Sequence, residues 1–319
     1  MTNSNKKTFA FTLTGAASLI ISAVLAFAVL TIFSACSNSS GGSGGGVTPP
    51  TTTDKTYMVD GVRFTLKNID AVSNKNIGHD DENDNKPHPV SISAYYIGET
   101  EVTQELWSKV MSGNPSNFTG KPKNPVEKVS WLNCIVFCNE LTKKVTELGA
   151  GECVYYKDAA FSTAYTAADA ASNTVPHAKW TAKGFRLPTE AEWEWAALGG
   201  TQNKWAGTNT VSTLGTYAWY NANSGNKTHQ VGTKTANGYG LRDMSGNVQE
   251  WCWDLYANNL SNPLPSDYTG ADPGTGTDRI VRGGHWGTDS NDAACAYRTV
   301  ADQTSPGSEN IGLRVVRRL

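Results

Sequence analysis

The 319-residue sequence has little charge of either sign and few of the residue clusters that bind metals or nucleic acids. Charged residues make up 18 % of the chain, and the formal net charge is −2. A nucleic-acid partner is not expected, because such a protein needs a basic face to neutralise phosphates. The five histidines have no zinc-ligand spacing and no His-Glu-x-x-His motif, which leaves metallohydrolase chemistry without support.

Cysteine is also scarce, and its number is informative. Beyond Cys36 there are five cysteines, and an odd count excludes a complete disulfide framework. Cys134 and Cys138 are spaced four apart in a helical pattern and are predicted to be small core residues. In contrast, 10 Trp, 12 Tyr and 31 Gly indicate a folded, loop-rich domain with enough apolar area for a core.

The N-terminal stretch has the pattern of a targeting signal. Lys6 and Lys7 precede an apolar run over residues 9–33, and Ser34 and Ala35 then lead to Cys36. This order predicts a secretory signal peptide over residues 1–35. It also resembles a bacterial lipobox, in which Cys36 is lipidated and becomes the mature N-terminus. The alternative is an uncleaved membrane anchor, because the apolar run is long enough to span a bilayer.

The signal is followed by a low-complexity linker over residues 36–56. Its Gly/Ser part is a flexible coil, and its Pro/Thr part is a stiffer, extended spacer. Such a linker holds a folded domain, here residues 57–319, away from a membrane. The sequence therefore predicts a lipid-anchored protein of the bacterial cell envelope, displayed at the outer-membrane surface.

Within the folded part, local patterns predict both strands and helices. Alternating apolar residues predict strands over 59–66 and 90–97. Cap residues followed by one-sided apolar faces predict helices starting after Thr103, Ser130 and Thr189. After Trp205 the chain has the pattern of short strands, turns and Gly-rich loops, so we expect a mixed α+β fold with few helices.

The acidic segment 79–86 resembles a calcium-binding loop at first sight. It lacks the turn glycine and the terminal glutamate that such loops use. A solvated acidic loop is therefore predicted there.

Six segments, in order along the chain, resemble the formylglycine-generating enzyme (sulfatase-modifying factor) family. They include Arg186-Leu187-Pro188-Thr189-Glu190 and Gly246-Asn247-Val248-Gln249-Glu250-Trp251. The full set covers residues 96–103, 124–131, 185–195, 237–251, 281–286 and 310–314. The resemblance implies one α+β domain of the C-type lectin-like fold, in the subtype of this family.

The resemblance does not extend to catalysis. Family members that oxidise a substrate cysteine to formylglycine use two cysteines after the Gly-Gly turn, and such a thiolate pair can bind a soft copper ion. Counted from Gly283, those positions fall on Thr288 and Ala293, and the nearest thiol is Cys295. A hydroxyl cannot replace a thiolate as a soft-metal ligand. We therefore expect no catalytic residue and no copper, with a protein-modifying oxidase as the alternative function.

A structural calcium site is the cofactor that the resemblance implies. The matching positions supply two carboxylates, Asp243 and Glu250, and two backbone carbonyls, Gly246 and Val248. Hard oxygen ligands on a tight turn suit Ca²⁺. The alternative is that the two carboxylates only tie the turn by accepting backbone hydrogen bonds.

The C-terminal segment, about residues 282–319, is small and polar between Trp286 and Asn310. Most of its residue types are reached by substituting adenines in an asparagine codon, as diversity-generating retroelements do. The whole chain resembles the treponemal variable lipoproteins of that class. The resemblance implies a protein or glycan ligand held by exposed side chains, predicted to be His285, Gly287, Thr288, Asp289, Asn291, Asp292, Thr299 and Asp302. The predicted scaffold residues are Gly283, Gly284, Trp286, Arg298, Gly312 and Arg314.

Two alternatives to a variable binding surface stay open at this point. The polar segment can be an ordinary surface loop, which loops usually are. The whole chain can also be a structural envelope lipoprotein that has no specific ligand.

Overall fold

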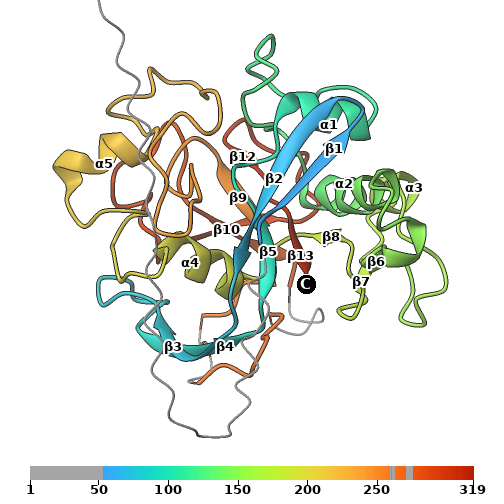
Figure 1. The fold of residues 1–319 in the computed structure, drawn as a ribbon, viewed down its shortest axis with the longest axis horizontal. Helices are drawn as coiled ribbons and strands as arrows, with labels where there is room; N and C mark the ends of the chain where they lie inside the picture. The colour runs from blue at the N-terminus through green and yellow to red at the C-terminus, as the bar shows by residue number, and fades with distance from the viewer. Residues whose placement is uncertain (1–52, 259, 261–262, 271–275) are drawn as a thin grey trace, which may run out of the picture. The chain divides into compact units, whose positions relative to one another are not determined.

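The computed structural model describes residues 53–258, 260, 263–270 and 276–319. All of the described residues belong to one compact unit of the chain. That unit contains two main sheets, with helices and long loops packed around them (Figure 1). The predicted signal peptide, Cys36 and most of the linker lie outside the described residues.

The first sheet brings the two ends of the domain together. Its five strands run in the order β1 (Lys55–Val59), β2 (Val62–Ile69), β5 (Tyr95–Gly98), β13 (Val316–Arg318) and β8 (Phe185–Arg186), and all neighbours are antiparallel. The last strand of the chain is therefore an inner strand of the sheet, between β5 and β8.

The single strand predicted over residues 59–66 is wrong, because the chain turns back within it. Asp60 and Gly61 form the turn between β1 and β2, with φ values of 46° and 84°. An Asp-Gly pair with two positive φ values is the preferred two-residue hairpin turn. The strand predicted over residues 90–97 is likewise two strands, β4 (His88–Ile92) and β5. They separate at Ser93, whose N–H and hydroxyl bond Asp267 at 2.6 and 2.8 Å.

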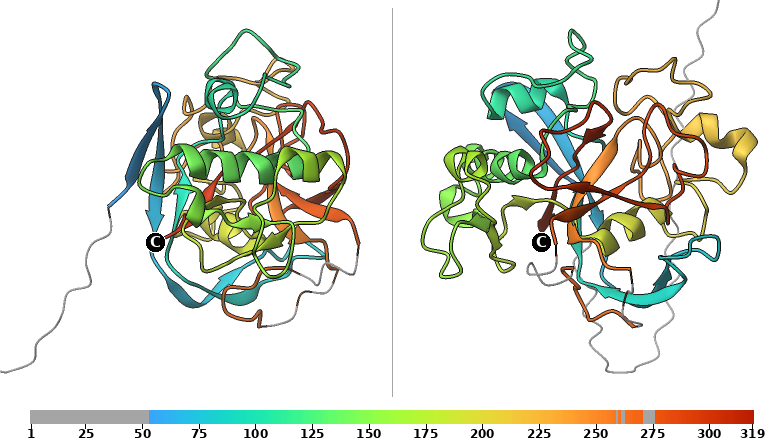
Figure 2. Two further views of the ribbon diagram at one scale, coloured as in Figure 1. Left: turned by 90° about the vertical axis from the view of Figure 1, so that its right-hand side faces the viewer. Right: turned by 180° about the vertical axis from the view of Figure 1, so that it is seen from behind.

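The second sheet carries the C-terminal segment. Its strand order is β11 (Arg298–Asp302), β10 (Asp278–Arg282), β9 (Gln249–Leu255) and β12 (Ile311–Gly312), with only the β9–β12 pair parallel. All seven residues of β9 are buried, so this strand runs through the interior. Two small ribbons complete the strands, one of β3 (Val72–Ile77) with β4 and one of β6 (Tyr155–Tyr156) with β7 (His177–Ala178). Figure 2 shows the second sheet from behind.

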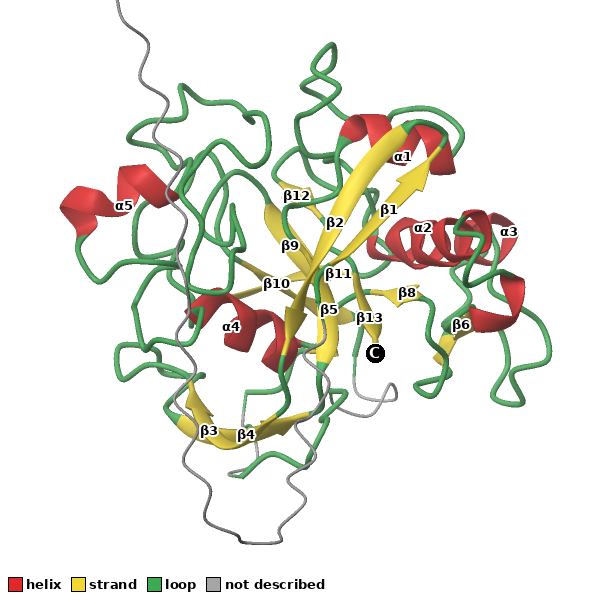
Figure 3. Cartoon of the chain, viewed as in Figure 1, coloured by secondary structure: helices red, strands yellow, loops and turns green. Residues whose placement is uncertain are grey.

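The predicted helix starts are confirmed. The hydroxyls of Thr103, Ser130 and Thr189 accept the capping hydrogen bonds of α1 (Gln104–Val110), α2 (Trp131–Lys144) and α4 (Glu190–Leu198). In α4 the Glu192 side chain completes a capping box. Three further helical turns, α3 (Ala167–Ala171), α5 (Val211–Tyr217) and the 3-10 helix η1 (Ala150–Glu152), had no clear sequence signal. Loops connect all of these elements and make up much of the domain (Figure 3).

The core is built from aromatic residues and contains no disulfide among the described residues. Trp131, Trp193 and Trp251 are among its largest fully buried side chains. Cys134 and Cys138 are buried and free, as predicted, and so are the other three described cysteines. No helix in the described part of the chain is long and apolar enough to cross a membrane.

Candidate ligand-binding face

The loop over residues 283–297, between β10 and β11, begins with two glycines that no other residue could replace without strain. Gly283 and Gly284 have φ values of 95° and 66°. A Cβ on Gly283 would lie 3.0 Å from the Trp193 ring, and one on Gly284 would lie 2.8 Å from the Asp292 carbonyl oxygen. Positive φ and close packing both require glycine here, as predicted. The backbone of the loop is thereby fixed at its start.

Two buried arginines fix the end of the loop. Arg282 binds the Glu194 carboxylate at 2.5 Å and donates to the carbonyl oxygens of Cys295 and Tyr297 at 2.7 and 2.8 Å. Arg298 makes two hydrogen bonds to Glu190, at 2.7 and 2.9 Å. Charge-assisted bonds of this kind are strong and directional. They confirm the predicted scaffold role of Arg298 and add Arg282, which sequence reasoning missed.

Six of the predicted ligand-binding residues lie together on this loop. Gly287, Asp289 and Asn291 are exposed, whereas His285, Thr288 and Asp292 are half-buried. The Asp289 carboxylate accepts hydrogen bonds from the N–H groups of Asn291 and Asp292 at 2.7 and 3.3 Å. The turn is thus stabilised locally, and its polar side chains face solvent from an ordered backbone.

The other two predicted residues lie apart, on β11. Thr299 pairs with Val281 in the sheet, and Asp302 pairs with Asp278 at the far end of the strand. Asp302 accepts hydrogen bonds from Thr277 and Thr304 at 2.7 Å each, and these bonds lower its pKa. Among the described residues no hydrogen bond joins Thr299 or Asp302 to the loop 283–297. The eight predicted positions therefore form two groups.

His285 is held in its neutral form at the start of the loop. Burial lowers its pKa to about 4. The N–H of Gly287 donates to Nδ1 at 3.0 Å, so the ring proton belongs on Nε2, which lies 3.0 Å from the side-chain amide of Asn310. The amide nitrogen of Asn310 is the atom that faces Nε2, so this tautomer requires the Asn310 amide to be flipped, which turns its otherwise unpartnered oxygen toward the ring proton.

Aromatic residues from other segments extend this face. Trp286 is half-buried, less than its predicted scaffold role implied, and it meets Phe118 edge-on with ring centroids 5.5 Å apart. The Ser224 hydroxyl donates to the Trp286 carbonyl oxygen at 2.6 Å, and the Asn221 N–H donates to the Thr288 carbonyl oxygen at 3.0 Å. Sequence patterns gave no signal for these contacts, because they join segments more than 60 residues apart.

The predicted calcium ligands have different surroundings. One Asp243 oxygen accepts the Gly232 N–H at 2.6 Å, whereas the other is buried without a partner. Both oxygens of Glu250 are already bonded, by Arg314 at 2.8 to 3.1 Å and by the Trp193 indole at 2.7 Å. Asp243 therefore has an oxygen that could bind a cation. The hydrogen bonds of Glu250 match the alternative, in which the carboxylate only holds the turn in place. Within the described residues, no three His, Cys, Asp or Glu side chains gather closely enough to bind a metal.

The positions that correspond to the oxidase cysteines have no free thiol. The Thr288 hydroxyl donates to the His285 carbonyl oxygen at 2.9 Å, and Ala293 is fully buried. Cys295 is 1 % exposed, and burial raises the pKa of its thiol. A protonated, enclosed thiol is a poor nucleophile and a poor metal ligand.

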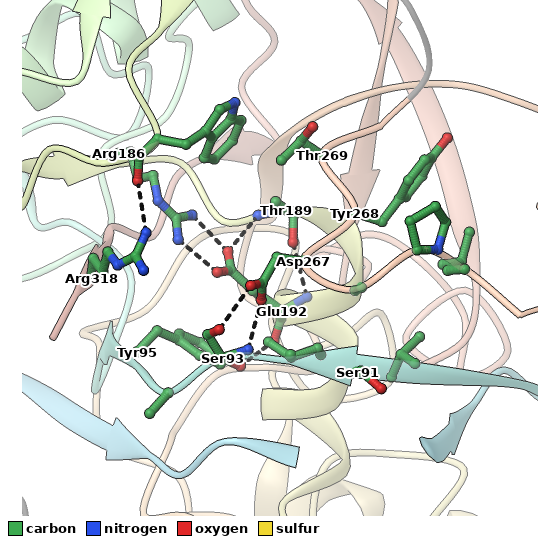
Figure 4. Close-up of a pocket in the computed structure, with 17 residues that line it drawn as sticks. Ser91, Ser93, Tyr95, Arg186, Thr189, Glu192, Asp267, Tyr268, Thr269 and Arg318 are labelled. Carbon is green, nitrogen blue, oxygen red and sulfur yellow. Dashed lines mark hydrogen bonds and ion pairs between the residues drawn. The ribbon is translucent and has the colours of Figure 1, made fainter. Parts of the chain in front are cut away.

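A separate cavity of about 80 Å³ lies between β4, the start of α4 and the segment 264–269 (Figure 4). Its polar side chains are bonded mainly to one another. Arg186 holds the Glu192 carboxylate at 2.7 and 2.6 Å, and Ser93 donates to Asp267 at 2.8 Å. Because these groups satisfy each other, the cavity specifies no ligand.

Comparison with known proteins agrees with this geometry. Residues 47–319 match the family model described as "Sulfatase-modifying factor enzyme 1-like domain". The chain belongs to this family. The match confirms the α+β, C-type lectin-like fold that the sequence motifs predicted.

Three relatives illustrate the range of this family. The structure of "Treponema denticola variable protein 1" superposes with a TM-score of 0.75 and 43 % identity, covering 84 % of this chain and 100 % of that one. "Chaperone protein LppX" of Paenibacillus barcinonensis is 36 % identical over 72 % of this chain and 81 % of its own length. The "Formylglycine-generating enzyme" of Streptomyces coelicolor is 32 % identical over 63 % of this chain, and the match spans 55 % of that enzyme. The relatives in this family therefore include one named as an enzyme, one named as a chaperone and one named as a variable protein.

Proposed function

We propose that this chain is a lipid-anchored protein of the bacterial cell surface that binds a macromolecular ligand without catalysis. The observation that carries this proposal is the loop 283–297. It exposes small polar side chains, such as those of Asp289 and Asn291, on a backbone fixed by Gly284 and Arg282. Adaptable polar groups on an ordered loop are the arrangement that antibody combining sites use.

The binding proposal is tested with an array of glycans and surface proteins. We expect the unmodified chain to bind at least one member of the array. The double variant Asp289→Ala/Asn291→Ala should lose this binding. The matched control is Ser162→Ala, an exposed polar residue of another loop. The proposal is wrong if both variants bind equally, or if no array member binds the unmodified chain.

We also propose that the segment 282–319 is diversified by a retroelement, with a variable protein among the relatives in support. Sequencing the 3′ end of the gene in several isolates tests this. We expect substitutions confined to codons after Gly284 and a nearby copy that differs at adenines. If the segment is the same in all isolates, diversification is wrong, and the chain is instead a lectin-like lipoprotein of fixed specificity.

The proposal that the chain is not an oxidase rests on Thr288, Ala293 and the buried Cys295. The test is incubation of the purified chain with copper and a cysteine-containing peptide. We expect no aldehyde product by mass spectrometry. Formation of formylglycine would establish the alternative function.

Membrane attachment is proposed to occur through Cys36. Cells expressing the full chain should incorporate labelled palmitate into it, and Cys36→Ala should abolish the label. Protease treatment of intact cells distinguishes display on the outer surface, where the domain is digested, from retention in the periplasm. A full chain that takes up no label yet stays in the membrane fraction would favour the uncleaved anchor.

Calcium is proposed to bind at Asp243, with the carbonyl oxygens of Gly246 and Val248 and the Glu250 carboxylate as the remaining ligands. The unpartnered buried oxygen of Asp243 supports this. Bound calcium would stabilise the turn before β9. Calorimetric titration of the full chain should show one Ca²⁺ site, and Asp243→Asn should weaken its affinity. If no heat of binding is measured, Asp243 and Glu250 serve only to hold the turn through hydrogen bonds.

A further inference from the structure

A second ordered loop, over residues 303–310, adjoins the loop 283–297 and contains none of the predicted ligand-binding residues. Its start is held by Asp302, whose carboxylate accepts the Thr304 N–H at 2.7 Å. Gly307 has φ of 89°, and a Cβ there would lie 2.7 Å from the Val129 backbone. The Trp286 indole N–H donates to the Glu309 carbonyl oxygen at 3.3 Å. The two loops therefore form one continuous surface.

A third loop, over residues 114–119, reaches the same surface and is held from beneath by Glu127. This side chain is fully buried, and its two oxygens accept the N–H groups of Asn117 and Phe118 at 2.9 and 2.8 Å. The Ser116 hydroxyl accepts the Glu127 N–H at 3.2 Å. A buried carboxylate is stable only with such hydrogen bonds, so Glu127 fixes the backbone that carries Phe118.

Aromatic rings lie where the three loops meet. Phe118, Trp286 and His285 are all half-buried, and the Trp286 ring centroid is 5.5 Å from that of Phe118 and 5.4 Å from that of His285. Exposed polar residues and glycine surround them: Asn117, Gly287, Asp289, Asn291, Ser308 and Glu309. An aromatic centre within a polar rim is the anatomy of a protein–protein interface, in which tryptophan is a frequent hot spot.

The rim of this three-loop surface is acidic. Asp289 and Glu309 are exposed and Asp292 is half-buried, and none of these carboxylates forms an ion pair with a described residue. The Asn117 side-chain amide donates to the Glu309 carboxylate at 2.9 Å, which orients it without neutralising its charge. Lys128 bonds the Ser308 carbonyl oxygen through its backbone N–H only, at 2.9 Å. A partner with basic side chains would therefore be complementary in charge.

We propose that the three-loop surface binds a protein, through a segment that packs an apolar side chain on Phe118 and Trp286 and places lysine or arginine near Asp289 and Glu309. This inference rests on the proposed binding function of the loop 283–297 and assigns its ligand to the proteins rather than the glycans. Phe118 lies outside the segment proposed to be diversified. Its contact would therefore be shared by all variants of this chain.

The experiment selects short peptides from a phage-displayed random library on the full chain and measures the affinity of the enriched peptides by fluorescence anisotropy. We expect them to combine a large apolar residue with lysine or arginine. Phe118→Ala should weaken their binding about tenfold or more, because it removes half of the aromatic centre. Phe161→Ala, which changes a phenylalanine that is 38 % exposed on another loop, is the matched control and should leave the affinity unchanged.

Glu309→Lys reverses an exposed charge of the rim and should weaken the same peptides several-fold. It decides the test if Phe118→Ala does not fold. The inference is overturned if no peptide is enriched, or if the enriched peptides bind Phe118→Ala and Glu309→Lys as well as the unmodified chain.

Failure of the proposed function would give a different result. Peptides that need Phe118 but bind the double variant Asp289→Ala/Asn291→Ala normally would support the aromatic centre and contradict a binding role for the loop 283–297. A glycan whose binding is lost in that double variant and survives Phe118→Ala would support the loop and overturn the present inference.

Discussion

Replacing Arg314 tests how the two sheets are joined. Its guanidinium binds Glu250 of β9 at 2.8 Å and the Gly98 carbonyl oxygen of β5 at 2.7 Å, and both charged side chains are fully buried. Removing one partner of a buried ion pair costs about 3–5 kcal/mol, because the other charge is left uncompensated. We expect Arg314→Met to lower the free energy of unfolding by about that amount. For a domain of this size the fall in Tm is on the order of 10 °C.

The loss should depend on pH with a definite sign. The charge of Arg314 lowers the pKa of both Glu101 and Asp243, so without it the folded pKa values of these two carboxyl groups rise further. Burial and neighbouring carboxylates already raise the pKa of Glu101 well above its usual range and that of Asp243 to about 6. An acid whose pKa is raised by folding destabilises the folded state as pH rises above the unfolded value. The cost of Arg314→Met should therefore be larger at pH 8 than at pH 5.

Urea denaturation at the two pH values, followed by tryptophan fluorescence, measures both effects. Arg318→Met, which changes an exposed arginine four residues further along the chain, should cost less than about 0.5 kcal/mol. A cost below about 1 kcal/mol for Arg314→Met, or an equal cost at both pH values, would refute the reasoning.

Three further predictions concern the loop and the thiols. The His285 ring should titrate near pH 4 in an NMR experiment, and a titration above pH 6 would contradict this. Its burial should lower the free energy of unfolding as pH falls from 6.5 towards 4, because in that range the imidazole is protonated only in the unfolded chain. Gly284→Ala should lower the free energy of unfolding by about 2 kcal/mol or more, because φ is 66° and the Asp292 carbonyl oxygen is close. The control Gly225→Ala should lower it by less, because the space around Gly225 is open. The five described cysteines should react with a thiol reagent only after denaturation; rapid labelling of Cys295 in the native chain would disprove its enclosed position.

The sequence predicted features that depend on neighbouring residues in the chain. Thr103, Ser130 and Thr189 cap helices because a cap needs only its own first turn. The hairpin at Asp60-Gly61 was also local, but the alternation on its two sides continued across the turn and hid it. Features with a clear local cause were therefore largely accessible, and the family motifs supplied the fold.

The arrangement of the candidate site was harder to predict, because it depends on distant contacts. Thr299 and Asp302 follow the loop closely in sequence, yet strand pairing places them on β11, apart from the other six positions. Phe118 is far from Trp286 in sequence and touches it in space.

The position of β13 has a consequence for which versions of this chain can fold. This strand follows the loop 283–297 in the chain, and it pairs with both β5 and β8 inside the first sheet. A chain cut short anywhere in the loop 283–297 would leave both of those strands with an unpaired edge, which favours aggregation. Substitutions on the loop surface are therefore compatible with the fold. Stop codons and frameshifts upstream of Val316 are not, because they remove β13 from the first sheet.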